Sequence, residues 1–594
     1  MAHYPHAVPS ASASMSNSKT HINMKNIKWS SLFIGLICLC SCVDLTELNE
    51  NPTKATSISP HLLIPTIQLT HSQYMQNTIR YFIYPGAFVN HWIGGWSMQE
   101  YGGKAKKNIA YMERLWVAYY PDIIKNAVAL VSQTTDNPEE VNLNAIGRIL
   151  KVEAFLKLTD YYGDIPYFEA GKIYNENIVK PRYDKQEDIY KAIFAQLDKA
   201  LEGLDTETAG LASFDCWCNG DRTLWKKIAN QLKLRMALRI VKVNPVDAEK
   251  YAKEAIQAGV LEDKDILINK SYSNELRRMM DWLDSGIGSS IVAFMNGYND
   301  PRRPLYFTTN VRHLVKKTAE PTGEKDQNNE DIYNESDILI RKGAQYIGVP
   351  VGCELGNKNG GNDNQRVYYS FLAGGYATPQ PIMFAAEGWF LRAEAKLRWT
   401  DAGQQSVKEL YEKGIEVSIR NQKSYRQSDA AAAWTEKKLT APDWAAIDDA
   451  AISSYINDDT SSPEGYTDPW KPEYNSDPTT SITVKWDEGA SNEEKLERII
   501  TQKWIAVFPN GNEGWAEVRR TNYPRYILTP EGGNNSGSEI ANEQLISRVK
   551  YPNSEGSINS ANMPKDNSQN TRVWWDTDYT MNNNGKWIQP NNFK

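Results

Sequence analysis

Apolar residues recur every three or four positions over several long segments of the sequence, which is the period of an amphipathic helix. Connections as short as Thr400-Asp401-Ala402-Gly403 separate some of these segments, so neighbouring helices are expected to pack as antiparallel pairs. The pattern predicts a mostly α fold. One segment from Lys185 illustrates the period with four branched apolar residues: Ile189, Ile193, Leu197 and Leu201. The predicted helix pairs lie at about residues 105–260 and 380–520.

Two of these segments place small alanines among larger apolar residues, in "LKVEAFLKLTD" and "FLRAEAKLRWTD". Small residues let helices approach closely, as in tetratricopeptide repeats. The spacing between pairs is irregular, so we predict repeat-like pairs rather than a solenoid. Asp221 is expected to cap the helix that follows it, and Pro121 to interrupt the helix that contains it.

Long polar stretches separate or follow the helices and are rich in Asn, Gly, Ser, Pro and Asp. No alternation of apolar and polar residues is sustained enough to predict a major sheet. Irregular loops of this length usually carry function. The predicted loop-rich excursions are residues 261–380, 422–490 and 521–594.

An apolar run from Leu32 to Leu39 follows two lysines, Lys25 and Lys28. A basic stretch before a short apolar run is typical of a secretory signal peptide. The run is far shorter than the roughly 20 apolar residues that a membrane-spanning helix needs. The residues before Met24 have no role in such a leader, which leaves open whether Met1 or Met24 is the true start.

The leader ends in Leu39-Cys40-Ser41-Cys42, which resembles a bacterial lipobox. In that motif, the cysteine that follows a small residue is lipidated and becomes the first residue of the mature chain. Since Ser41 precedes Cys42 and bulky Leu39 precedes Cys40, we predict lipidation of Cys42 and membrane attachment through that anchor. Residues 1–41 are then an upstream extension and a lipoprotein signal peptide. An ordinary signal peptide with a chance cysteine is the alternative.

Composition argues against several classes of function. A formal net charge of −7 offers no basic excess for nucleic acid. The sequence has no phosphate-binding Gly-x4-Gly-Lys-Ser/Thr, no Gly-x-Ser-x-Gly and no His-Glu-x-x-His. We therefore predict no catalytic residue, no metal and no cofactor. The histidines behind the leader are too few for a typical zinc site or a His-based triad: His61, His71, His91 and His313.

Three cysteines remain behind Cys42, an odd number with no framework spacing. Cys216 and Cys218 flank Trp217 and could form a strained disulfide or half of a metal site, but a pair of thiols in a loop is favoured. The loop "NKNGGNDNQ" from Asn357 offers oxygen atoms to calcium, yet it lacks the spacing and the bidentate Glu of an EF-hand. A plain polar loop is therefore expected there.

Several motifs occur in order from Cys42 to about Asp576: "LTELNENPTKAT", "YYGDIPY", "YNDPRRPLYF", "AAEGWFLRAEAKLR", "IITQKWIAVFPNGNEGWAEVRRTNYPR" and "VWWDTDYT". Together they resemble the SusD/RagB family of outer-membrane nutrient-binding lipoproteins. Within it, Gln502-Lys503-Trp504 and Arg519-Arg520-Thr521 are similar to signatures of the SusD-like subgroup.

The resemblance implies a SusD-like helical scaffold with several tetratricopeptide-repeat-like helix pairs and long irregular loops, in which residues 42–594 form a single domain. It also implies a lipid-anchored protein on the extracellular side of the outer membrane. Such a protein binds an oligosaccharide or peptide and delivers it to a partner SusC-like TonB-dependent transporter, without chemistry of its own. The alternatives are a glycoside hydrolase, which needs only two suitably separated carboxyl groups, and a structural subunit of the transporter without its own ligand.

Candidate ligand contacts lie in the glycine-punctuated stretch "NHWIGGWSMQEYGG" from Asn90. Aromatic rings there would stack on sugar rings, and polar side chains would bond to hydroxyl groups. The alternative for the tryptophans is packing in the core. The predicted contacts are Asn90, Trp92, Trp96, Gln99 and Tyr101, with Trp217 and Trp282 in second rank. Four tryptophans in amphipathic helices are predicted to be core residues: Trp225, Trp389, Trp504 and Trp515.

Two further motifs have a functional and a structural interpretation. Arg519-Arg520 could bind an anion, but bidentate pairing that ties a helix end to carboxylates or carbonyls is favoured. Asp164 could be a catalytic acid, but its Gly-Asp-x-Pro context favours a tight turn.

Overall fold

The structure is a computed structural model of the 594-residue chain. Contacts divide the chain into two units, Met1–Ile58 and Ser59–Lys594, and the described residues lie almost entirely in the second. The structure describes residues 58–73, 85–93, 108–205, 214–268, 286–309, 321–325, 331–333, 346–351, 369–373, 378–428, 441–468, 472–526, 545–577 and 587–593.

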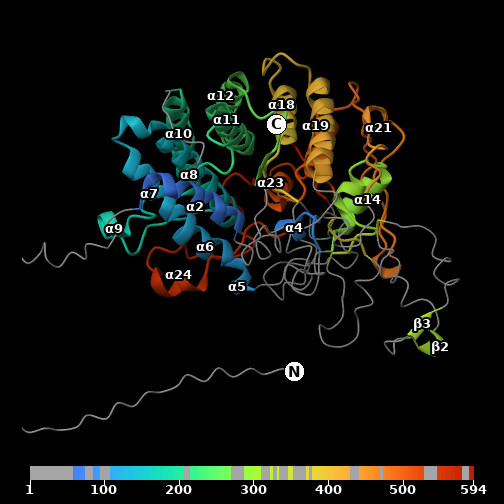
Figure 1. The fold of residues 1–594 in the computed structure, drawn as a ribbon, viewed down its shortest axis with the longest axis horizontal. Coiled ribbons are helices and arrows are strands. Elements are labelled where there is room, and N and C mark those ends of the chain that lie inside the picture. The colour runs from blue at the N-terminus through green and yellow to red at the C-terminus, as the bar shows by residue number, and fades with distance from the viewer. Residues whose placement is uncertain are drawn as a thin grey trace, which may run out of the picture. The chain divides into compact units, whose positions relative to one another are not determined.

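Helices dominate these residues, which confirms the mostly α prediction (Figure 1). The longer helices are α2 (Pro60–Gln73), α7 (Lys125–Thr134), α8 (Val141–Tyr162), α10 (Gln186–Leu204), α11 (Arg222–Arg239), α12 (Pro245–Ala258), α14 (Ser289–Gly297), α18 (Ala385–Arg398), α19 (Val407–Ser428), α21 (Asp449–Ile456), α22 (Asn492–Ala506) and α23 (Gly511–Thr521). Shorter ones are α4 (Pro85–Phe88), α5 (Ile109–Met112), α6 (Arg114–Ala118), η2 (Tyr119–Ile124), η3 (Pro138–Glu140), α9 (Ile173–Glu176), α15 (Arg303–Tyr306), η5 (Pro472–Tyr474) and α24 (Asn553–Ile558).

The helices pack side by side in a continuous series, and α8 and α11 lie inside it (Figure 1). Helix α8 contacts α7 and α10, α10 contacts α11, and α11 contacts α12 and α18. Helix α18 in turn contacts α19 and α22. Because α8 and α11 are covered on several sides, polar as well as apolar side chains of both helices are buried. Charged groups on them therefore need partners inside the protein.

The local signals in the sequence act as predicted. Asp221 caps α11, since its Oδ1 accepts hydrogen bonds from the backbone N–H of Thr223 (2.8 Å) and Leu224 (3.2 Å). Pro121 lies in the wide π-helical turn η2 between α6 and α7. Proline lacks the N–H group that a regular α-helix needs, and a wider turn accommodates the gap. Ser491 and Glu494, which were not singled out from the sequence, form a capping box at the start of α22.

The strands are few and short among the described residues. Strand β1 (Ile266–Ile268) pairs antiparallel with β4 (Gln380–Met383), and β2 (Pro321–Lys325) pairs antiparallel with β3 (Asp331–Tyr333). The register joins Ile266 to Met383 in the first pair. These two-stranded ladders agree with the expectation of no major sheet.

Among the described residues, helices α14, α15, α21 and α24 and the 3-10 helix η5 lie inside stretches predicted to be loop-rich. Helix α14 has the sequence "SSIVAFMNG" and is buried on most sides, so it carries no alternation of apolar and polar faces for the period to reveal. Helices α21 and α24 are too short to establish a period. In the described part of the chain, we find no helix that is both long and apolar enough to cross a membrane.

Candidate functional site

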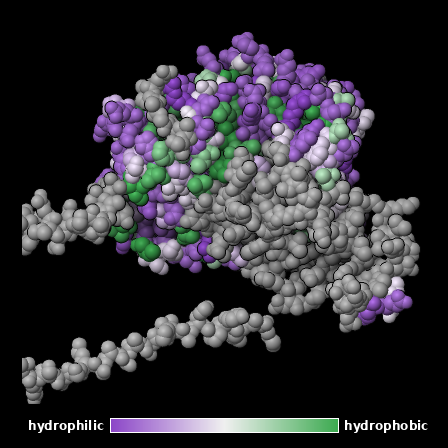
Figure 2. All heavy atoms as spheres, viewed as in Figure 1, coloured by the Kyte–Doolittle hydropathy of each residue, from purple (hydrophilic) through white to green (hydrophobic). Residues whose placement is uncertain are grey.

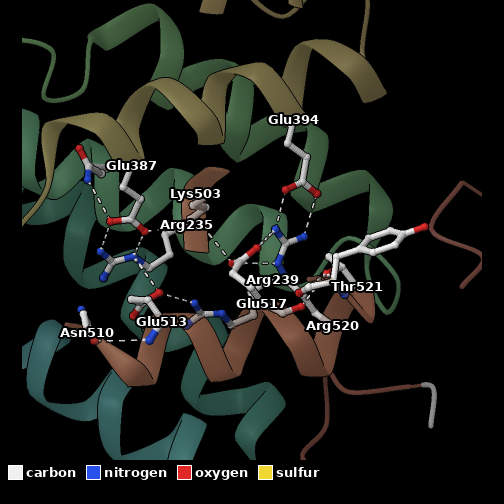
Figure 3. A network of polar contacts seen from close by, with 12 residues as sticks. Arg235, Arg239, Glu387, Glu394, Lys503, Asn510, Glu513, Glu517, Arg520 and Thr521 are labelled. Carbon is white, nitrogen blue, oxygen red and sulfur yellow. Dashed lines mark hydrogen bonds and ion pairs between the residues drawn. The ribbon is translucent and has the colours of Figure 1, made fainter. Parts of the chain in front are cut away.

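A group of buried charged residues joins α11, α18, α22 and α23 near the centre of the helical series (Figure 3). In Figure 3, the residues of α18 and α23 face each other, and Arg235 of α11 and Lys503 of α22 lie between them. Asp160 of α8 joins the group through Arg239. We call this group the charged seam. Its members are Asp160, Arg235, Arg239, Glu387, Glu394, Lys503, Glu513, Glu517 and Arg520.

The pairs in the charged seam are bidentate or shared. Arg235 donates from Nε to Glu387 Oε1 (2.8 Å) and from Nη2 to Glu387 Oε2 (2.6 Å). Arg520 donates from Nη1 to Glu394 Oε1 (2.7 Å) and also pairs with Glu517. Lys503 Nζ donates to Glu517 Oε1 (3.0 Å) and also pairs with Glu387. It therefore joins the pair of Arg235 with Glu387 to the pair of Arg520 with Glu517. Every cation in the seam thus meets at least one carboxylate.

Ion pairing keeps Glu517 and Arg235 of the seam ionised. Burial alone would favour the neutral form of Glu517, but Arg520 and Lys503 outweigh it and lower the pKa of that carboxyl to about 2. Burial also opposes the charge on Arg235, yet Glu387 and Glu513 hold the pKa of its guanidinium above the ordinary value. A carboxylate that remains ionised at neutral pH is a poor general acid. The ion pairs of Arg520 with Glu394 and of Lys503 with Glu517 join α23 to α18 and to α22.

Arg519 has a structural role of a different kind. Its guanidinium lies over the ring of Trp515 (3.6 Å to the centroid) and over that of Trp575 (4.7 Å). Its Nη1 donates to the backbone oxygens of Asp160 (2.9 Å) and Ser547 (3.0 Å). Arg519 and Arg520 thus tie α23 to carbonyls and carboxylates, which confirms the structural interpretation of this pair.

Asn90 and Trp92 are packed in the core. Asn90 Oδ1 accepts a hydrogen bond from the backbone N–H of Ser290 (3.0 Å). Trp92 is 0 % exposed, stacks on Phe508 (5.2 Å between centroids) and donates from Nε1 to the oxygen of Pro509 (3.3 Å). Neither side chain presents a surface to a ligand, so their placement supports the packing alternative.

Trp217 is also largely buried, at 7 % exposure, and stacks on Trp225. Its loop is organised by Asp215, a residue that the sequence did not single out. Asp215 Oδ1 accepts from Gln68 Nε2 (2.8 Å) and from the backbone N–H of Trp217 (3.1 Å), while Oδ2 accepts from Trp225 Nε1 (2.7 Å). This carboxylate holds the loop to α2 and α11.

Comparison with known proteins identifies the family. A family model for SusD-like proteins, described as "Starch-binding associating with outer membrane", matches residues 51–552. The chain belongs to this family.

Solved structures of SusD homologues share the fold. A chitin-binding SusD homologue from Flavobacterium johnsoniae is 27 % identical with a TM-score of 0.68, and the match covers 87 % of this chain and 98 % of that one. A SusD-like protein from Bacteroides thetaiotaomicron is 26 % identical with a TM-score of 0.69, covering 89 % and 100 %. A SusD homologue from Bacteroides uniformis is 28 % identical with a TM-score of 0.68, covering 88 % and 100 %. None of the curated protein sequences compared with the chain matches it.

The remaining predictions for this SusD-like protein divide into two groups. The four tryptophans predicted to be core residues are buried, at 0 % to 7 % exposure, which confirms that prediction: Trp225, Trp389, Trp504 and Trp515. Several candidate residues lie outside the described part of the chain and stay predictions: Cys42, Trp96, Gln99, Tyr101 and Trp282. The Asn-rich loop from Asn357 lies outside it too.

The chemistry of the Cys216–Cys218 loop is settled in favour of free thiols. Burial raises the pKa of both thiols, and that of Cys218 rises strongly. Thiols that stay protonated are poor nucleophiles and poor metal ligands. Within the residues that the structure describes, no group of His, Cys, Asp and Glu could hold a metal ion.

Asp164 accepts a hydrogen bond from the backbone N–H of Gln186 (3.0 Å) and pairs with Lys185 (2.7 Å). It therefore anchors the turn before α10, as its sequence context predicts. The residues of the charged seam were mostly missed, although a signal for them exists. Glu387 and Glu394 lie among apolar residues of a predicted helix, and a charge on the apolar side of a helix requires a buried partner.

Among the recesses of the described surface, two contain no predicted ligand contact. One of about 770 Å³ lies between α19 and α21, where Arg420 is paired with Asp449. The other, of about 450 Å³, is lined by Trp399 and Phe593 beside Arg398. Arg398 is paired with Glu394 and also donates to the oxygen of Asn592. Their charged groups are therefore largely engaged within the protein.

Proposed function

We propose that this SusD-like protein binds a glycan at the cell surface and delivers it to a SusC-like TonB-dependent transporter. The observation that carries the proposal is the family match over residues 51–552, together with the likeness to a chitin-binding SusD homologue over 98 % of that chain. Proteins of this family are binding proteins associated with the outer membrane. We further propose that Cys42 carries the lipid anchor and that the protein faces the extracellular side.

The described residues support a binding role. The charged seam holds Glu517 ionised, and the described tryptophans of the helices are used in packing. These buried tryptophans are therefore not available to stack on a sugar. We propose that Trp96 and Tyr101 stack on the sugar and that Gln99 bonds to its hydroxyl groups, with Trp282 as a further contact. These assignments rest on the sequence.

Isothermal titration calorimetry on the full-length chain tests the proposal. The panel contains chitooligosaccharides, maltooligosaccharides, other neutral oligosaccharides and peptides, and each mixture is analysed for products afterwards. We expect one glycan class to bind without cleavage. Binding of peptides alone would mean that the ligand is a peptide and not a glycan. Cleavage by the pure protein would contradict a binding role. Silence across the panel would favour a structural subunit of the transporter.

A pair of variants tests the proposed contact. Removal of one aromatic ring that stacks on a ring of the ligand costs about 1–3 kcal/mol of binding free energy. Trp96→Ala is therefore expected to weaken glycan binding about tenfold or more. The matched control is Trp574→Ala, which removes a partly buried tryptophan that packs on Tyr190. Equal affinities for Trp96→Ala and wild type would remove Trp96 from the site.

A further inference from the structure

Arg148 and Lys151 lie one turn apart on α8, and both are half-buried. We call them the cation pair. Arg148 donates from Nε to Asn144 Oδ1 (2.7 Å) and from Nη1 to Gln196 Oε1 (2.5 Å), and both acceptors are neutral amides. The ammonium group of Lys151 lies over the rings of Tyr167 (5.1 Å) and Phe155 (5.9 Å). In the described ranges, no carboxylate forms an ion pair with either cation.

Lys233 on α11 shows how the same fold treats a lysine in a similar place. Its ammonium group also lies 5.1 Å from the centroid of a tyrosine ring, that of Tyr251. Unlike Lys151, it bonds to two carboxylates, Asp198 at 2.8 Å and Glu254 at 2.6 Å. The aromatic surroundings match, and the two carboxylates are the difference.

The pKa values agree with this difference. Burial, and then the positive charges of Arg148 and Lys172, lower the pKa of Lys151 to about 8. At Lys233, burial acts in the same direction, but the two carboxylates outweigh it and raise the pKa. A half-buried cation without a counter-charge is unfavourable, and an external anion would relieve it.

Other charged groups around the cation pair are already engaged. Lys172 is paired with Glu176 (2.9 Å), and Glu169 is paired with Arg182 (2.6 Å). Asp184 accepts hydrogen bonds from the backbone N–H groups of Tyr167 (2.8 Å) and Phe168 (2.9 Å). The two ion pairs are each neutral and Asp184 carries one negative charge, so these groups together with the cation pair have a net positive charge.

The exposed ring of Phe168 contacts Tyr167, the tyrosine over which the ammonium group of Lys151 lies. Phe168 is 47 % exposed and packs edge-on against Tyr167, with 5.0 Å between ring centroids. Figure 2 shows that apolar residues (green) reach the described surface at several places between hydrophilic ones (purple). A ring at the surface next to uncompensated positive charge offers both a stacking face and an electrostatic contact for a charged sugar.

We propose that the cation pair is a subsite for an oxyanion carried by a glycan, either a uronate carboxylate or a sulfate ester. Arg148 has Nη2 left over for an incoming oxygen, and the ammonium group of Lys151 supplies a second donor. Phe168 lies where a sugar ring attached to the oxyanion can stack. The glycan as carrier rests on the proposed function, whereas the anion site itself does not.

The first test compares ligands that differ only in charge. Oligogalacturonate is titrated into the full-length chain beside its methyl ester, which keeps the sugar and removes the carboxylate. We expect the acid to bind more tightly, and Lys151→Met and Arg148→Gln each to weaken its binding at least tenfold. A sulfated disaccharide is titrated in the same way to test sulfate esters. The oxyanion whose binding is weakened in Lys151→Met and Arg148→Gln is the one that the subsite recognises.

The matched control is Lys191→Met on α10, because Lys191 is exposed, is paired with Glu187 at 2.7 Å, and carries the same charge. Its affinity for the acid should stay within twofold of wild type. Equal affinity of the wild type for oligogalacturonate and its methyl ester, together with no binding of the sulfated disaccharide, would overturn the proposal. So would a loss in Lys191→Met as large as that in Lys151→Met, which would reflect net charge alone.

The second test uses inorganic sulfate and needs no glycan. Only the unprotonated amine of a lysine is acylated, so the rate at Lys151, followed by peptide mass spectrometry against pH, reports its protonation. Bound sulfate should slow acylation of Lys151 and leave Lys191 unchanged at equal ionic strength. If sulfate protects Lys151 but no glycan binds, the anion site stands and the proposed function fails. If neutral glycans bind and neither sulfate nor the charged sugars act on Lys151, the proposed function stands and this subsite fails.

Discussion

The charged seam and the cation pair bury positive charge in opposite ways. In the charged seam, Arg520 and Lys503 share Glu517, and every cation pairs with at least one carboxylate. In the cation pair, Arg148 meets only neutral amides and Lys151 only aromatic rings. The same helical scaffold thus pairs the cations of the seam with carboxylates and leaves the cation pair on α8 without one. Cations that are paired with carboxylates indicate a structural role, whereas cations without a carboxylate partner indicate capacity to bind an anionic ligand.

The largest effect is expected from breaking the seam at Arg520. Arg520→Met leaves Glu394 and Glu517 buried with fewer counter-charges, and removal of one partner of a buried pair costs about 3–5 kcal/mol. The free energy of unfolding from chemical denaturation should fall by that amount. Arg420→Met is the control, because Arg420 is 47 % exposed and surface pairs contribute about 0–1 kcal/mol. Equal losses in the two variants would mean that the seam is not a special source of stability.

The next effect compares the two lysines that lie over tyrosine rings. Lys233→Met leaves Asp198 and Glu254 without their shared donor, and a lost charged hydrogen bond costs about 1–3 kcal/mol. Lys151→Met removes an uncompensated charge and keeps an apolar side chain against Tyr167. In the absence of ligand, this variant should be as stable as wild type or more stable. A loss in Lys151→Met equal to that in Lys233→Met would remove the contrast between the two sites.

The sequence predicted the helical scaffold better than it predicted the site. Period, caps and short turns act over a few residues, so helices such as α11, with its cap Asp221, follow from local physics. Partner choice acts over long distances in the chain: Arg235 and Glu387 are 152 residues apart. The period predicts that both residues lie in helices, but it does not predict which helices meet.

The aromatic candidates also show that local sequence does not predict which residues meet in space. Trp92 stands in a glycine-rich stretch that suggested an exposed side chain, yet it packs on Phe508, far along the chain. Composition and local context alone do not separate a tryptophan that stacks on sugar from one that stacks on another ring. The cation pair was missed for a related reason, since the absence of a counter-charge is visible only when all neighbours in space are known.

The smallest effect is a change in the pH dependence of stability, and it tests the cation pair without any ligand. The pKa of Lys151 is about 8 in the folded protein against 10.5 for an ordinary lysine. Between these values the unfolded chain binds more protons than the folded one, so this group makes the folded state more stable as pH rises through that window. The difference in unfolding free energy between wild type and Lys151→Met should therefore shift in favour of wild type between about pH 8 and about pH 10, which both lie within the window. Lys233→Met should not show this shift, because the pKa of Lys233 is raised and its charge persists over the same range. A flat difference for Lys151→Met would mean that a counter-charge reaches Lys151 in solution, and the cation pair would then resemble the charged seam.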